Sequence, residues 1–113
     1  MPAARLETIC LALPEATLVP AFGGITYRVR NRIFAMPRER EGRPAVWLKA
    51  PPGSQEILTG ADPDRFFRPP YVGPKGWVGM MLDADCDFEE VAVLVRRSYR
   101  LIAPKRLGAL VEG

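Results

Sequence analysis

The chain has 113 residues, a net charge of +3 and hydrophobic and charged fractions of 48% and 26%, which are typical of one globular domain and exclude a disordered chain. It contains no histidine, which excludes histidine metal ligands and histidine-based triads. No apolar run approaches the roughly 20 residues that cross a bilayer, and Glu7 interrupts the apolar N-terminal stretch. We therefore expect a single cytoplasmic domain over residues 1–113 that does not contact a membrane.

The N-terminal part predicts a helix followed by strands. A stripe of apolar residues at helical spacing indicates an amphipathic helix at 3–13, and Pro14 ends this helix. The residues of the stripe are Leu6, Ile9, Cys10 and Leu13. Strands are expected at 17–22 and 25–30, joined by Gly23-Gly24 as a tight connection or bulge.

The next segment predicts a hairpin. Side chains alternate along 26–30, which places Tyr27 and Val29 on a covered face and Arg28 and Arg30 together on a wet one. Asn31 tolerates the left-handed conformation of a tight turn, and a strand at 33–36 returns antiparallel.

The remaining elements complete an α+β pattern. A charged turn at 38–43 precedes a strand at 45–49, and a short helix opened by Pro51-Pro52 is expected to end at Gly60. A loop at 61–70 and a strand at 77–82 follow. The last helix begins at Asp87, with Glu90 at capping-box spacing, and ends at Pro104; on it, the Ser98 hydroxyl is expected to bond back to the helix backbone. The order α-β-β-β-β-α-β-α predicts an antiparallel β-sheet with helices packed on one face.

Short segments spread along the chain carry a family resemblance: Leu13-Pro14, Phe22-Gly23, Tyr27-Arg28-Val29, Arg32-Ile33-Phe34-Ala35, Leu48-Lys49-Ala50, Pro70-Tyr71-Val72-Gly73, Gly76-Trp77-Val78 and Ser98-Tyr99. In this order they resemble the YjbR/MmcQ-like family of small bacterial proteins. The resemblance implies a fold similar to that of the frataxin-like protein CyaY, in agreement with the element order above. It also implies DNA binding through a double-winged surface, without catalytic residues.

The arginine-rich middle of the chain is the first candidate site. Guanidinium groups on a strand and its turns could neutralise successive phosphates, or could simply keep the wet face of a sheet soluble. No helix-turn-helix or zinc-finger pattern is present, so we expect contacts to the nucleic-acid backbone, with DNA as the partner. The candidate residues are Arg28, Arg30, Arg32, Arg38, Arg40, Arg43, Lys49 and Lys75.

The loop at 68–77 is the second candidate. Tyr71 and Trp77 flank Lys75 and could stack on unpaired bases or on a small planar ligand. The alternative is that both rings serve packing, with Trp77 at the start of a buried strand. The alternative function is therefore a protein-interaction or small-ligand module that uses this loop.

Catalysis and metal binding find little support in the sequence. The acidic run at 83–87 opens like a calcium loop, but Phe88 stands where the loop needs glycine and Leu94 where it needs glutamate. No phosphate-binding glycine motif is present, and no serine has a histidine to activate it. We expect a non-catalytic domain without a cofactor or metal.

Overall fold

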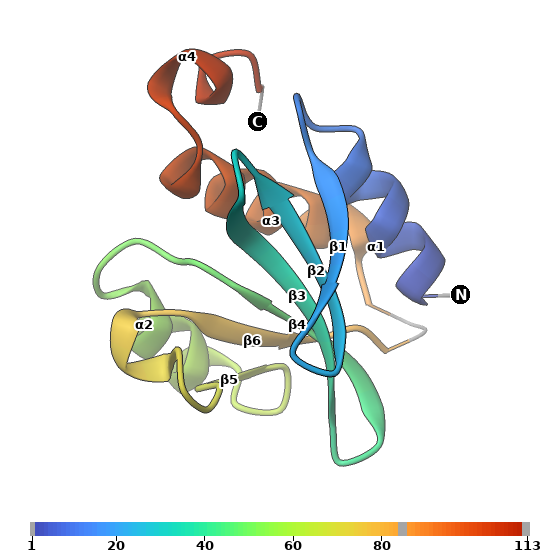
Figure 1. Cartoon of the computed structure of the whole chain (residues 1–113). Coiled ribbons are helices and arrows are strands. Elements are labelled where there is room, and N and C mark those ends of the chain that lie inside the picture. Colours follow the sequence, from blue (N-terminus) through green and yellow to red (C-terminus); the bar gives the residue numbers. More distant parts are fainter. Residues whose placement is uncertain (1, 84–85, 112–113) are drawn as a thin grey trace.

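The structure is a computed structural model that describes residues 2–83 and 86–111. Its elements are α1 (Pro2–Leu11), β1 (Thr17–Ala21), β2 (Gly24–Val29), β3 (Arg32–Arg40), β4 (Arg43–Leu48), α2 (Ser54–Ala61), β5 (Phe66–Phe67), the 3₁₀ turn η1 (Gly73–Lys75), β6 (Val78–Met81), α3 (Phe88–Ile102) and α4 (Lys105–Gly108). Within the described residues, six strands form one antiparallel sheet in the order β1-β2-β3-β4-β6-β5. The predicted α+β class, with helices on the sheet, is confirmed (Figure 1).

Three consecutive hairpins build the first four strands. Their registers leave two-residue loops at Phe22-Gly23, Arg30-Asn31 and Glu41-Gly42, and both residues of each loop have positive φ. This is the requirement of a type I′ turn, whose twist matches that of the strands it joins. The predicted turn at Asn31 is confirmed, and the connection expected at Gly23-Gly24 lies one residue earlier.

The core lies between one face of the sheet and the helices α1 and α3, which pack beside each other (Figure 1). Phe34 of β3 meets Tyr99 of α3 edge to face, with ring centroids 5.3 Å apart. The Tyr99 hydroxyl also donates to the Pro14 carbonyl at 2.6 Å, which joins α3 to the chain between α1 and β1. Cys10 is fully buried here, as its place on the apolar stripe predicts, and burial raises the pKa of its thiol.

Ser98 differs from the sequence prediction. Its hydroxyl does not bond back to the helix: it donates to the Phe34 carbonyl at 2.6 Å and accepts from the Lys49 backbone N–H at 2.9 Å. The side chain is fully buried. It therefore connects α3 to β3 and to the end of β4, a tertiary role that helical spacing does not reveal.

Several boundaries also differ. Strand β3 continues to Arg40 although Pro37 lies within it; β2 pairs with β3 only as far as Ala35, so Pro37 occupies an edge position, where proline is tolerated. Helix α2 begins after Gly53 and continues through Gly60. The loop expected at 61–70 contains β5, and α4 follows Pro104. Asp87 is the N-cap of α3 as predicted, whereas the Glu90 side chain bonds to Arg65.

Candidate nucleic-acid interface

The face of the sheet opposite α1 and α3, called here the open face, carries the candidate site. A β-bulge places Phe34 opposite no residue of β2, because Tyr27 pairs with Ala35 and Arg28 with Ile33. Phe34 and Ala35 both join the helix-side core as a result. Ile33 and Met36 then fall on the open face, and the alternation that follows adds Arg38 and Arg40.

Three of the predicted arginines share this open face: Arg28, Arg38 and Arg40. The Arg28 Nε donates to the Thr26 hydroxyl at 3.0 Å, and the Arg38 Nη1 donates to the Ile25 carbonyl at 3.0 Å. These two guanidinium groups therefore lie against neighbouring residues of β2. Among the described residues, none of the three arginines forms an ion pair with a carboxylate.

Two of these arginines, Arg38 and Arg40, lie over aromatic rings of the sheet. The Arg38 guanidinium carbon lies 5.8 Å from the ring centroid of Trp47 on β4, and that of Arg40 lies 4.4 Å from the ring centroid of Phe67 on β5. Phe67 in turn covers Gly79, where an added Cβ would lie 2.2 Å from a ring atom. Glycine at this position lets the ring lie flat on the sheet, and the ring then carries Arg40 by a cation–π contact.

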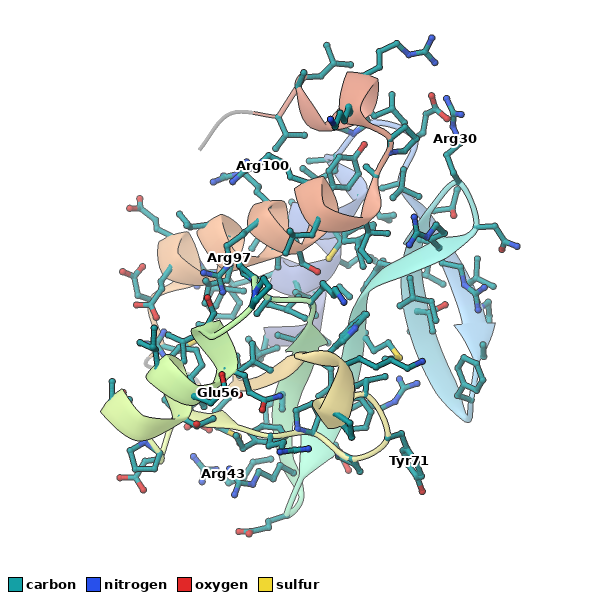
Figure 2. The ribbon with its side chains drawn as sticks, turned by 90° about the vertical axis from the view of Figure 1, so that its left-hand side faces the viewer. Arg30, Arg43, Glu56, Tyr71, Arg97 and Arg100 are labelled. Carbon is teal, nitrogen blue, oxygen red and sulfur yellow. The ribbon has the colours of Figure 1, made fainter. Side chains whose placement is uncertain are left out.

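A hollow of about 490 Å³ opens on this face, and it is lined by Phe22, Ile33, Met36, Arg38, Trp47, Tyr71 and Val72. Its size lies within the ~300–1,000 Å³ range of small-molecule sites. Phe22 and Tyr71 are 76% and 88% exposed, so they form its rim. Figure 2 shows Tyr71 pointing away from the ribbon into solvent.

The loop that carries Tyr71 is held by Gln55, a buried residue of α2 that sequence reasoning missed. Its amide nitrogen donates to the carbonyls of Gly73 at 2.8 Å and of Trp77 at 2.5 Å. Both acceptors follow Tyr71 within one loop, so a single side chain fixes the shape of that loop. Glutamine in a polar helix turn gives no sequence signal for this role, because its partners are backbone groups far along the chain.

Other predicted residues lie elsewhere or are already engaged. The guanidinium of Arg30 is bound by Glu15 at 2.6 Å, and that of Arg43 by Asp83. The Arg30 hydrogen bond lowers the pKa of Glu15, and the bond to Asp83 raises the pKa of Arg43. Figure 2 shows Arg30 and Arg43 at opposite ends of the molecule.

The expectation that Arg28 and Arg30 share one strand face is therefore wrong. Strand β2 ends at Val29, and Arg30 occupies the turn with a φ of 50°. Its side chain leaves the direction set by strand alternation, because a left-handed residue redirects the backbone.

Of the last three basic candidates, Arg32 and Lys49 donate to backbone carbonyls, and the carbonyl of Lys75 accepts one of these bonds. Arg32 donates to the Ile102 carbonyl at the end of α3 at 3.3 Å. The Lys49 ammonium donates to the Lys75 carbonyl at 3.2 Å, which connects the end of β4 to η1. The predicted set is thus split, and only Arg28, Arg38 and Arg40 lie together on the open face.

Trp77 is not available for stacking. It is 7% exposed, so the packing interpretation of this ring is correct and its assignment as a ligand contact is wrong. Phe22, which the sequence analysis did not select, takes its place opposite Tyr71. A bulky residue before glycine in a short hairpin loop is the signal that could have identified it.

The acidic run contributes to structure. Asp83 pairs with Arg43, and Asp87 accepts from the Glu89 backbone N–H at 2.9 Å at the start of α3; Asp85 lies outside the described residues. In residues 2–83 and 86–111, no group of three or more acidic, cysteine or histidine side chains is placed to hold a metal ion. In the same part of the chain, no helix combines the length and apolar character needed to span a bilayer.

The fold and this face define a small α+β domain whose sheet has one helix-covered and one arginine-bearing face. The YjbR family model matches residues 11–101, and the chain belongs to that family. The fold is similar to that of the crystal structure of Deinococcus radiodurans protein DR2400, which contains a DUF419 domain, at a TM-score of 0.77 and 24% identity over 89% of this chain and 80% of that chain. No curated protein matches the chain significantly.

Proposed function

We propose that this protein is a non-catalytic nucleic-acid-binding domain that contacts the phosphate backbone, with DNA as the first candidate, through Arg28, Arg38 and Arg40. One observation carries the proposal: three guanidinium groups share a face and, within the described residues, are held only by neutral groups. Their charge is not neutralised by a neighbouring carboxylate, so a phosphate can complete their hydrogen bonding. The expected bacterial, cytoplasmic location belongs to the same proposal, because it places the domain with DNA.

The charge distribution supports the proposal through a contrast within one sequence. Carboxylates bind Arg30 and Arg43, whereas no carboxylate of the described residues binds Arg28 or Arg40. An arginine that already has a carboxylate partner must exchange that partner for a phosphate, and gains less from binding. The four residues therefore provide two pairs of equal charge that differ in whether they are free to bind.

The experiment compares two double variants of equal net charge. Fluorescence anisotropy with labelled single-stranded and duplex DNA is measured across a salt series for the parent, for Arg28→Gln with Arg40→Gln, and for Arg30→Gln with Arg43→Gln. Each neutralised phosphate contributes a slope of about −0.9 on duplex and about −0.7 on single strands in a plot of log K against log salt. Three arginines thus predict about −2.7 on duplex, and the first double variant should retain about −0.9.

The two variants distinguish the open face from general charge. We expect the Arg30/Arg43 variant to retain most of the parent slope. Equal losses in both double variants would show that binding follows total charge and not the open face. No binding of the parent at roughly 50 mM salt, which favours phosphate contacts, would exclude the proposed function.

The hollow favours a second candidate, a small planar ligand held against Tyr71. Its volume of about 490 Å³ and its rim aromatic are features of a ligand site. The affinity of an uncharged ligand of this kind would not fall as the salt concentration rises. The salt series therefore separates this candidate from nucleic-acid binding.

A further inference from the structure

We propose that the hollow between Phe22 and Tyr71 accepts an unpaired base, so that the ligand of the open face is single-stranded nucleic acid. This inference rests on the proposed function, since the arginines supply the backbone contacts beside it. It specifies the class of nucleic acid, which phosphate contacts alone leave open.

The first evidence is the backbone strain at the two rim aromatics. Phe22 and Tyr71 have φ values of 56° and 64°, a left-handed conformation that bulky side chains rarely adopt. They are also the two most exposed large hydrophobic residues of the described chain, at 76% and 88%. Neither ring is buried in the core, so hydrophobic burial does not offset the strain of its backbone. Six non-glycine residues of the described chain have positive φ. Phe22 and Tyr71 are the two aromatic ones, and both border one hollow, in keeping with the concentration of such strain at binding sites.

The second evidence is that both rings are mounted on fixed backbone. Phe22 is the first residue of a two-residue hairpin turn. The buried Pro69 lies two residues before Tyr71. After Tyr71 comes the segment that Gln55 holds through the Gly73 and Trp77 carbonyls. A preorganised aromatic platform loses little conformational entropy when a ligand stacks on it.

The third evidence is the chemistry of the hollow. Its floor combines apolar side chains such as Met36 with Trp47, and Arg38 lies on its wall. Stacking on aromatic rings beside arginines is how proteins hold unpaired bases with little regard to sequence.

Base pairing determines whether the bases of duplex or of single-stranded DNA can enter the hollow. In a duplex both faces of each base are stacked, so its flat sides cannot contact Tyr71 or Phe22 unless the base is turned out, which costs unpairing energy. A single strand presents those sides freely. The open face should therefore bind single strands more tightly than duplex at the same salt concentration.

The experiment measures three labelled probes on the full chain: a single strand, the same strand with abasic sites, and the duplex. The variants are Tyr71→Asn and Phe22→Asn, because asparagine tolerates the left-handed conformation and keeps the turn folded. Tyr71→Phe retains the ring, and Ile57→Asn, at a 69% exposed residue of α2, is the surface control. Each asparagine variant of the rim should weaken single-strand binding by about 5- to 100-fold, the range expected for one stacked base.

The controls and probes give distinct outcomes. We expect Ile57→Asn to bind like the parent, and Tyr71→Phe, which keeps the ring, to lose much less affinity than Tyr71→Asn. Duplex binding should change less than about twofold in every variant, since duplex contacts only the arginines. Equal affinity for the abasic and intact strands would overturn the base site while leaving the arginine surface intact. Absence of binding to all three probes would overturn both proposals. A dimer detected by light scattering without DNA and abolished by Tyr71→Asn would also overturn the base site, because a second copy would then occupy the hollow.

Discussion

At the scale of single residues, Ser98 shows how one hydroxyl connects the two layers of the domain. It satisfies the Phe34 carbonyl next to the β-bulge and the Lys49 N–H beyond the end of β4. Ser98→Ala removes both hydrogen bonds at once. The Phe34 carbonyl and the Lys49 N–H then lose this partner in the buried space around residue 98. Because each such group costs roughly 1–3 kcal/mol, we expect a loss of about 2–6 kcal/mol in the free energy of unfolding. Urea unfolding followed by circular dichroism measures it.

The matched control for this variant is Ser54→Ala. Ser54 is the first residue of α2 and is half-buried, and its hydroxyl makes no hydrogen bond among the described residues. Its replacement should change the free energy of unfolding by less than about 0.5 kcal/mol, as is usual for surface positions. A loss of that small size for Ser98→Ala as well would contradict the linking role of the hydroxyl.

Gln55 has the corresponding role for the candidate site. Its amide donates to two carbonyls of the loop after Tyr71, whereas no residue of α2 is among those that line the hollow. A residue can thus position a binding loop without contacting the ligand. Such a contact depends on the tertiary fold, and neither residue type nor spacing along the chain indicates it.

At the scale of elements, the sequence predicted the order and type of the main helices and strands because their apolar periodicity is strong. It failed where pairing depends on distant partners. Strand β5 has only two residues, Phe66 and Phe67, set between an Asp-Pro-Asp segment and two prolines. It exists because β6 offers it an edge, and a run this short carries no period of its own.

The candidate site was predictable to a similar extent. The arginine-rich stretch and Tyr71 lead to the open face, but the division of the arginines does not follow from sequence. Arg30 lies in a left-handed turn and is paired with Glu15, so it does not join the site on the open face. Arg43 is paired with Asp83. These carboxylates lie 15 and 40 residues away along the chain. Only the folded chain shows which positive charges remain without an acidic neighbour.

The three hairpin turns allow stability and binding to be separated. Phe22→Asn and Glu41→Asn each create Asn-Gly, the preferred sequence of a type I′ turn, at a residue with a φ of 56° or 53°. Because asparagine tolerates the left-handed conformation, each change should raise the free energy of unfolding by about 1 kcal/mol. We expect only Phe22→Asn to weaken binding to single-stranded DNA, since Glu41 does not line the hollow.

Two measurements check this prediction: urea midpoints for stability and anisotropy for binding. A loss of stability in Phe22→Asn would show that the ring contributes to packing. Weakened binding in Glu41→Asn would show that turn stiffness, and not the aromatic ring, controls affinity.

At the scale of the whole molecule, the sheet separates the core from the proposed binding surface. The helix-covered face holds the buried core. The open face holds the two exposed rings together with Arg28, Arg38 and Arg40, which form no ion pair among the described residues. Substitutions on the open face should therefore alter binding with little effect on folding, and substitutions on the other face should do the reverse. The similar crystal structure supports the fold, and the variants above test the proposed use of the open face.

The dependence of stability on pH is a property of the covered layer. Burial, assisted by the nearby Cys10 and Glu7, raises the pKa of Tyr27 from its ordinary value of 10.0 to about 12. Burial also raises the pKa values of Tyr99 and of the Cys10 thiol. A group whose pKa is higher in the folded state contributes stability that is complete below its unfolded pKa and is lost as the pH rises. We therefore expect urea midpoints that decline between about pH 9 and 12, within one cooperative transition.

Tyr27→Phe isolates one part of this decline, because it keeps the buried ring and removes the ionising hydroxyl. The variant should show a shallower loss of midpoint between pH 10 and about 12, the interval between the unfolded and folded pKa values of Tyr27. Tyr71→Phe removes a hydroxyl from an exposed ring and is the matched control. If the slope of Tyr27→Phe equals that of the parent, ionisation of Tyr27 does not limit alkaline stability, and Cys10 becomes the group to test next. If the slope is shallower, ionisation of Tyr27 accounts for that part of the alkaline loss of stability.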